Sequence, residues 1–217
     1  MTINGYSDRI NHALAFAAKH HDRQVRKGTR LPYLTHPANV AIILMRYGRD
    51  EDIVIAGILH DVIEDCVREN YTRAMLEQRI GDKFGMTVLD TVLAVTHRTV
   101  DDGGTDLSSD ERKDDYLERL IGASEAARWV CAADKLHNAG TIVADLQRTI
   151  EPMTVWGRFN AGRDGTVRWY RRVYERLCEL GFTAAIMEEL RRVVESLEEL
   201  AESSQTADSG ASPSVRR

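Results

Sequence analysis

The chain has 217 residues, of which 43% are hydrophobic and 29% charged, a composition that excludes collagen-like, mucin-like and wholly disordered proteins. This length supports one domain with a short appendage. The formal net charge of −5 gives no overall attraction to nucleic acid or to an anionic membrane, so we expect neither as a partner. The three cysteines are odd in number and far apart, which argues against disulfides and cysteine zinc sites. With no signal-peptide pattern and no apolar run near the ~20 residues of a membrane span, we expect a cytoplasmic protein.

Helical periodicity dominates the chain, and no segment predicts a strand. The expected helices cover 7–22, 36–48, 50–65, 71–80, 83–97, 111–121, 124–148, 163–180 and 183–202. Glycine and proline mark a basic loop after the first helix, and two adjacent glycines lie in a second loop over 98–110. Residues 203–217 are small and polar, so we expect them to be disordered. The sequence therefore predicts an all-α protein, a compact helical bundle of one domain over 1–202 with a disordered tail.

The dipeptide His-Asp occurs twice, and by itself it is weak evidence for any chemistry. His21-Asp22 ends a helix and enters the basic loop, where a solvated pair is the simplest interpretation. His60-Asp61 instead follows 53–59, a run that is apolar on all sides. A histidine and carboxylates at the end of a buried helix are costly unless they are paired or coordinated. The second pair is therefore the candidate site.

Helical spacing extends this candidate site to two further acids. Glu64 lies four residues after His60 and three after Asp61, and Asp65 lies four after Asp61, so on one helix these side chains share a face. Three acids on one face repel one another, and either a bound cation or protonation relieves the repulsion. The alternative, that the helix ends here and its acids are in water, is about equally compatible with the position.

A second apolar helix carries the same design. Residues 129–133 are apolar, and Asp134 and then Asn138 follow at helical spacing. His36 begins another helix, so the candidate set contains two imidazoles and two carboxylates: His36, His60, Asp61 and Asp134. This mixture suits manganese, iron or zinc better than calcium, which prefers oxygen ligands only.

Three segments, HDRQVRKGTRLPYLTHP, ILHDVIED and AADKLHN, follow one another in this order. Together they resemble the motifs HxGQxRKxxxPYxxHP, LLHDxxED and LADxLHN of the HD-domain metal-dependent phosphohydrolases. The resemblance is strongest to the hydrolase domain of the Rel/SpoT-type guanosine tetraphosphate enzymes and to their small stand-alone relatives. It covers about residues 6–145, and three linked motifs are far more specific than a dipeptide. The family is all-helical, in agreement with the periodicity.

The resemblance implies a role for each matching residue. One Mn²⁺ ion would be held by His36, His60, Asp61 and Asp134. Glu64 and Asp65 would be the catalytic pair that supports the hydrolytic water. Arg26 and Lys27 would contact substrate phosphates, and Asn138 would line the nucleotide site, with Thr141 a weaker candidate. The activity so implied is removal of the 3′-pyrophosphate from (p)ppGpp, with a small phosphorylated nucleotide as partner.

The basic loop supports this interpretation from composition alone. Residues 23–30 hold four basic residues and no acid, within a chain of net charge −5. A solvated basic loop is the usual meaning of such a run. Because the loop leads directly into His36, we favour phosphate binding.

Several features leave alternatives open. Two positions depart from the family motifs: Cys66 stands where threonine is usual, and Ala139-Gly140 replaces larger residues. A length of 217 residues leaves no room for a synthetase domain, so alarmone synthesis is not expected. The motifs also fit hydrolysis of another nucleotide or phosphorylated metabolite, or a nucleotide-sensing HD domain, although the complete ligand set argues against the last. The oligomeric state is not indicated.

The remaining aromatic and histidine residues are interpreted as structural. The segment 156–174 is rich in arginine and aromatic side chains, and Arg158, Arg163 or Tyr170 could line a ribose or base site. We favour packing of Trp156, Trp169 and Tyr170 in the core with the arginines outside. Four of the seven histidines are assigned to structural or surface positions: His12, His20, His97 and His137.

Overall fold

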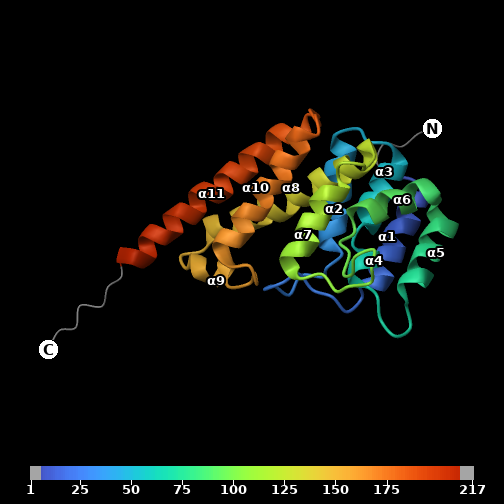
Figure 1. Cartoon of the computed structure of the whole chain (residues 1–217), viewed down its shortest axis with the longest axis horizontal. Coiled ribbons are helices and arrows are strands. Elements are labelled where there is room, and N and C mark those ends of the chain that lie inside the picture. Colours follow the sequence, from blue (N-terminus) through green and yellow to red (C-terminus); the bar gives the residue numbers. More distant parts are fainter. Residues whose placement is uncertain (1–5, 211–217) are drawn as a thin grey trace.

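The computed structural model describes residues 6–210, and over this range it is built from helices, with three isolated β-bridges in place of strands (Figure 1). The predicted all-α fold is thereby confirmed. The helices are α1 (Asp8–His20), α2 (Thr35–Arg46), α3 (Glu51–Leu59), α4 (Val62–Asp65), α5 (Arg73–Phe84), α6 (Met86–Val95), α7 (Ser109–Arg119), α8 (Glu125–Arg148), α9 (Pro152–Trp156), α10 (Gly162–Glu179) and α11 (Ile186–Gly210).

Side-chain caps define where several helices begin. The hydroxyls of Ser7, Thr72 and Ser124 each accept a hydrogen bond from a backbone N–H of the first turn. Before α7, Ser108 and Glu111 form a reciprocal capping box. These caps satisfy N–H groups that have no partner inside a helix, so the local sequence determines these starting points.

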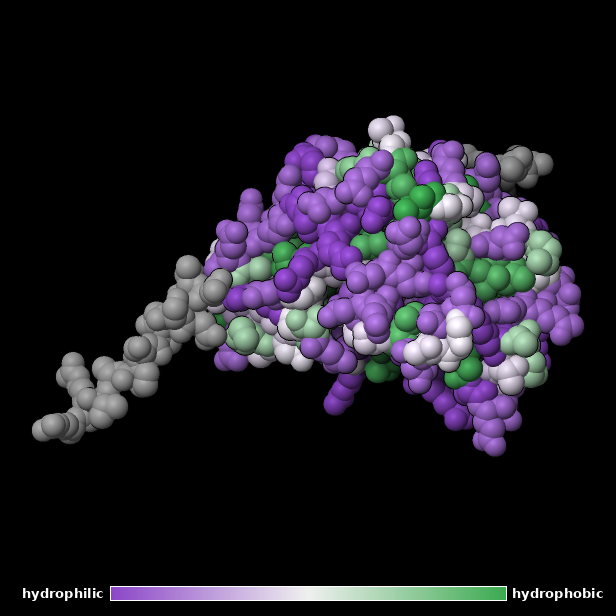
Figure 2. All heavy atoms as spheres, viewed as in Figure 1, coloured by the Kyte–Doolittle hydropathy of each residue, from purple (hydrophilic) through white to green (hydrophobic). Residues whose placement is uncertain are grey.

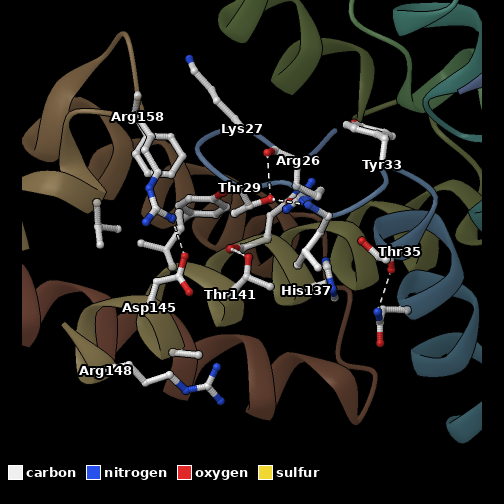
Figure 3. A pocket seen from close by; sticks show the side chains of 18 residues that line it. Arg26, Lys27, Thr29, Tyr33, Thr35, His137, Thr141, Asp145, Arg148 and Arg158 are labelled. Carbon is white, nitrogen blue, oxygen red and sulfur yellow. Dashed lines mark hydrogen bonds and ion pairs between the residues drawn. The ribbon is translucent and has the colours of Figure 1, made fainter. Parts of the chain in front are cut away.

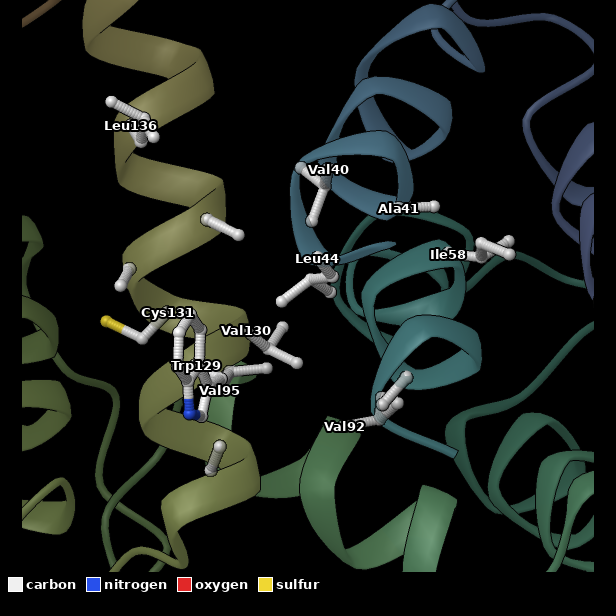
Figure 4. Close-up of a cluster of buried hydrophobic side chains, with 14 of the residues drawn as sticks. Val40, Ala41, Leu44, Ile58, Val92, Val95, Trp129, Val130, Cys131 and Leu136 are labelled. Carbon is white, nitrogen blue, oxygen red and sulfur yellow. The ribbon is translucent and has the colours of Figure 1, made fainter. Parts of the chain in front are cut away.

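Helix α3 lies at the centre of the helices that precede α9. It packs against α1, α2, α6 and α8, and its residues from Val54 to Leu59 are buried. Gly57 permits the close approach of α2, because a Cβ there would lie 2.5 Å from Cδ1 of Leu44. In Figure 4, Leu44 and Val130 point toward one another from α2 and α8. The apolar run of the sequence thus becomes a helix enclosed on every side.

Helix α8 joins the two parts of the molecule. One end packs against α2, α3 and α6, while α10 and α11 run alongside the rest of it (Figure 1). The face in Figure 2 is covered mainly by hydrophilic side chains, especially over α10 and α11. Among the residues described, no helix combines the length and apolarity needed to cross a membrane.

Three local features differ from the sequence prediction. The helix expected over 50–65 is interrupted at His60-Asp61, so α3 and α4 are separate helices. The backbone N–H of Asp65 still donates to the carbonyl of Asp61 at 2.8 Å, the spacing that the sequence predicts for these two acids. The short helix α9 was not expected; it has only five residues, too few to show a period, and starts with Pro152. Helix α11 runs to Gly210, so residues 203–210, expected to be disordered, are helical, and residues 211–217 lie outside the described range.

Candidate active site

Four side chains from three parts of the chain meet at the centre of the molecule. His36 comes from the first turn of α2, His60 and Asp61 from the break between α3 and α4, and Asp134 from the middle of α8. His36 Nε2 lies 3.2 Å from Asp134 Oδ1 and 3.4 Å from Asp61 Oδ2. His60 Nε2 lies 3.2 Å from Asp61 Oδ1 and 3.7 Å from Asp134 Oδ1. The candidate ligands predicted from sequence are therefore brought together.

Hydrogen bonds to the far side of each imidazole orient both rings. His60 Nδ1 donates to the carbonyl of Gly57 at 2.8 Å, so its Nε2 faces the cluster. His36 Nδ1 lies 2.8 Å from Nδ1 of His137, and burial lowers the pKa of His137 to about 4. A neutral His137 can accept a hydrogen bond from His36, and this leaves the His36 Nε2 lone pair directed at the two carboxylates.

The two carboxylates are held by neighbours of different kinds. The Tyr33 hydroxyl donates to Asp61 Oδ2 at 2.7 Å. Asp134 accepts from Lys135 Nζ at 2.6 Å on Oδ2 and from Asn138 Nδ2 at 2.5 Å on Oδ1. These bonds leave each carboxylate with an oxygen near the imidazoles.

The donor set fits a divalent cation. His36, His60 and Asp134 offer ligand atoms that all lie within 4.8 Å of one another, and all three residues are buried. Within the described chain, His60 Nε2 is a buried nitrogen with no hydrogen-bond partner. Burial opposes a charge on His60, yet Asp61 and Asp134 raise its pKa to about 9, so the two carboxylates favour a positive charge at this point. Imidazole and carboxylate donors match a transition ion such as manganese, iron or zinc.

Glu64 and Asp65 extend from α4 beside this cluster. Both side chains reach solvent, but partial burial together with the Asp61 carboxylate raises the pKa of Glu64 to about 7 and that of Asp65 to about 6. Glu64 Oε2 accepts a hydrogen bond from the backbone N–H of His97 at 2.8 Å. A carboxyl group that titrates near neutral pH, next to a cation site, can accept a proton from water.

A cavity of about 520 Å³ adjoins the cluster through His137 and Asn138 (Figure 3). The basic loop forms one wall, with Arg26 and Lys27, and α8 forms another, with Thr141. Arg26 Nη2 donates to Asn138 Oδ1 at 2.7 Å, which links the two walls. The residues predicted to contact phosphate and nucleotide thus line one cavity, next to the predicted ligands.

The segment 156–174 contributes more to this cavity than the sequence suggested. Trp156 is buried and Trp169 packs against the core, as expected. Tyr170 is buried in the core, as expected, and also lines the cavity. Arg158 lines the cavity too, so placing every arginine of the segment outside was wrong for Arg158. Arg158 Nη1 donates to Asp145 Oδ2 at 2.5 Å, a pairing between distant segments that local sequence does not reveal.

Lys135 and His137 are further residues at the cluster whose contacts the sequence interpretation left out. His137 is three residues after Asp134 on α8, a spacing that already places the two on the same face of the helix. Lys135 adjoins Asp134 in sequence, and the pairing is made by its long side chain folding back inside the core.

The model of the HD-domain family matches residues 13–167, more than half of the chain. The chain belongs to the HD-domain family. This HD domain is 37% identical over 142 residues to the guanosine-3′,5′-bis(diphosphate) 3′-pyrophosphohydrolase MESH1 of Xenopus tropicalis, an alignment that covers 64% of the chain and 70% of the relative. The corresponding protein of Drosophila melanogaster is 33% identical over 174 residues, which cover 79% of the chain and 86% of the relative.

Longer proteins also contain a similar HD domain. The chain is 32% identical over 138 residues to a GTP pyrophosphokinase of Myxococcus xanthus, covering 62% of the chain but only 17% of that protein. Among solved structures, it superposes with a TM-score of 0.63 and 28% identity on a metazoan orthologue of SpoT described as hydrolysing ppGpp. That match covers 94% of this chain and 98% of the other.

Proposed function

We propose that this HD domain is a metal-dependent phosphohydrolase that removes the 3′-pyrophosphate of (p)ppGpp and leaves GDP or GTP. The observation that carries the proposal is the cluster of two imidazoles and two carboxylates beside a cavity with a basic wall. The names of the MESH1 relatives support the choice of substrate. The alignments cover only 17% and 18% of the longer Rel/SpoT-like relatives, so the activities of those whole proteins are not carried over to this chain.

The cation site consists, in this proposal, of His36, His60, Asp61 and Asp134, with Mn²⁺ as the ion. When bound, a divalent ion supplies Lewis acidity toward a phosphoryl oxygen and favours deprotonated water. The contacts of Lys135 and Asn138 with Asp134, and of Tyr33 with Asp61, fix the carboxylates in advance.

Glu64 accepts the proton of the attacking water, and Asp65 supports it as a second carboxylate. The raised pKa of Glu64, about 7, suits proton transfer at neutral pH, because a base is most effective when its pKa lies near the working pH. The hydrogen bond from the His97 N–H holds one carboxylate oxygen and leaves the other available.

Arg26 and Lys27 balance the charge of the substrate phosphates. Arg26 is held in place by Asn138 and lies 5.8 Å from the centre of the Tyr33 ring, so its guanidinium is already oriented before substrate binds. The cavity volume of about 520 Å³ is in the range that accommodates a nucleotide-sized ligand. Asn138 and Thr141 then line the nucleoside side of the site.

The substrate assignment is tested by incubating the purified protein with ppGpp, GTP and a panel of phosphomonoesters in manganese buffer. Release of pyrophosphate from ppGpp, with GTP and the monoesters turned over at least about tenfold more slowly, is the expected result. Turnover of another compound without turnover of ppGpp would replace the substrate. Binding of ppGpp without hydrolysis of any compound would identify a sensor instead.

A further inference from the structure

The segment Thr96–Arg98, which follows α6, contacts the candidate catalytic carboxylate through its backbone. The N–H of His97 donates to Glu64 Oε2 at 2.8 Å. From sequence alone His97 is a structural or surface residue. Its place in the fold gives it a more specific role.

The ring of His97 is held by aromatic side chains of two other helices. It stacks on Tyr116 of α7, with ring centres 4.4 Å apart and an angle of 13° between the planes, and it lies 5.8 Å from Trp169 of α10. Such contacts restrict the rotation of the ring, and because the ring is attached through Cβ to the Cα that carries the amide, they also restrict the orientation of the His97 N–H.

The same aromatic pair also contacts the residue that holds a candidate metal ligand. Lys135 Nζ lies 5.2 Å from the centre of the Tyr116 ring and 5.6 Å from that of Trp169, and it donates to Asp134. One cluster of side chains therefore adjoins both the cation site and the Glu64 carboxylate.

Hydrogen bonds and ion pairs of two α7 residues, Arg119 and Asp115, hold the segment on both sides of His97. Arg119 donates to the carbonyl of Thr96 at 2.6 Å and to those of Leu93 and Ala94 at 3.3 Å, which satisfies acceptors at the open end of α6. Asp115 accepts hydrogen bonds from Arg119 and, at the other side, from Arg98. The amide between these two anchors has little freedom to turn away from Glu64.

We propose that His97 is a positioning residue for hydrolysis: its stacked ring and anchored backbone aim its amide at Glu64 and so keep that carboxylate directed at the attacking water. The proposal rests on the proposed function of Glu64. It does not require the imidazole itself to exchange a proton, so an aromatic ring without nitrogen should serve equally well. Misplacement of a catalytic group by about 1 Å can cost on the order of 100-fold in rate.

The test compares His97→Ala, which keeps the N–H but loses the stacking, with His97→Phe, which keeps both. Kinetics are measured with ppGpp in manganese buffer, well below the unfolding temperature of every variant. We expect His97→Ala to lower kcat about 10- to 100-fold with KM and Mn²⁺ affinity within about twofold, and His97→Phe to stay within about threefold of the wild type. His12→Ala is the matched control, because it removes a ring contact with Phe84 far from the site.

A second readout does not depend on activity. In the metal-free protein, amide hydrogen exchange of the segment containing His97 should be slow in the wild type and in His97→Phe, and at least about tenfold faster in His97→Ala and in Glu64→Ala. Equal kcat for His97→Ala and the wild type, or equal loss in His97→Ala and His97→Phe, would overturn the proposal. So would unchanged amide exchange in His97→Ala.

Failure of the proposed function gives a different result. If the wild type turns over another phosphoester in place of ppGpp, the same comparison is made with that compound, and a selective loss of kcat in His97→Ala still supports the positioning role. If the wild type hydrolyses none of them, the exchange measurement decides alone.

Discussion

The buried ion pair between Lys135 and Asp134 offers a direct test of how the candidate cation site is held together. Lys135→Met keeps the length of the side chain and removes its charge. Nζ lies 2.6 Å from Oδ2, and the two side chains are only 9% and 10% exposed, so Asp134 would keep its charge without its main partner.

The size of the effect follows from this geometry. At an effective dielectric constant of 20, two unit charges 2.6 Å apart attract by about 6 kcal/mol. Part of this is offset because methionine has no ammonium group to remove from water, and loss of one partner of a buried pair costs about 3–5 kcal/mol in practice. His60, whose pKa of about 9 keeps it protonated at neutral pH in the metal-free protein, still faces Asp134 at 3.7 Å. We therefore expect Lys135→Met to lower the free energy of unfolding by about 3 kcal/mol, the lower end of this range.

The measurement is thermal unfolding of wild type and Lys135→Met, each with EDTA and with saturating Mn²⁺. In EDTA the Tm of Lys135→Met should be about 6–12 °C lower than that of the wild type, at about 2–4 °C per kcal/mol for a chain of this size. Mn²⁺ should recover part of the loss, since it supplies positive charge next to Asp134. Lys19→Met is the control, because Lys19 is exposed and such changes usually stay within about 0.5 kcal/mol. A loss in Lys135→Met no larger than the control would refute the reasoning.

Three further predictions follow from other parts of the structure. Asp61→Ala should lose both metal binding and activity, whereas Glu64→Gln should bind Mn²⁺ in calorimetry like the wild type and lose about 10²–10⁴-fold in kcat; loss of metal in both would mean that the roles are divided wrongly. Burial and nearby cations lower the pKa of His20 to about 4 in the folded protein, whereas the pKa of a histidine in the unfolded chain is about 6.5. The unfolded state therefore binds this proton first, and stability is lost as the pH falls from about 6.5 toward 4. Urea titrations at pH 7.5 and 5 should show a larger decrease for the wild type than for His20→Phe, and equal decreases would exclude this histidine as a source. Gly28 has φ +73°, and a Cβ there would lie 2.3 Å from the side chain of Arg158 in the cavity wall. Gly28→Ala should therefore lower the free energy of unfolding by more than the ~1–2 kcal/mol of the left-handed conformation alone. Gly48→Ala, at φ +66° with open space around it, is the control in the same unfolding assay, and an equal loss in both variants would show that the contact is unimportant.

The helices and the cluster could be predicted because their signals are local. The apolar run before His60 predicts a buried helix with Asp61 at its end, and the motifs of the family add His36 and Asp134 to the candidate ligand set. The assumption that one helix continues through His60-Asp61 was wrong: the His60 ring bonds back to Gly57, and Asp61 has φ −90° and ψ −7°, which ends the regular helix there. Val62 and Ile63 continue the apolar helical spacing beyond His60-Asp61, so the periodic pattern carried no sign of the break.

Contacts made by the backbone or between distant segments were beyond the reach of sequence reasoning. The bond from His97 to Glu64 uses an amide that every residue except proline possesses, so no side-chain pattern marks it. Arg158 reaches the cavity across the basic loop because a glycine there leaves room for it, and neither residue is informative without the other. Both cases depend on tertiary packing.

The central claim is that this HD domain hydrolyses (p)ppGpp at its 3′ end with a divalent ion. Phosphorus NMR of a reaction with ppGpp and Mn²⁺ tests it most directly, because it identifies both products. The account predicts inorganic pyrophosphate and GDP in equal amounts, with no products after EDTA treatment or in Asp134→Ala. Release of orthophosphate, removal of the 5′-phosphates, or undiminished turnover in EDTA would contradict it.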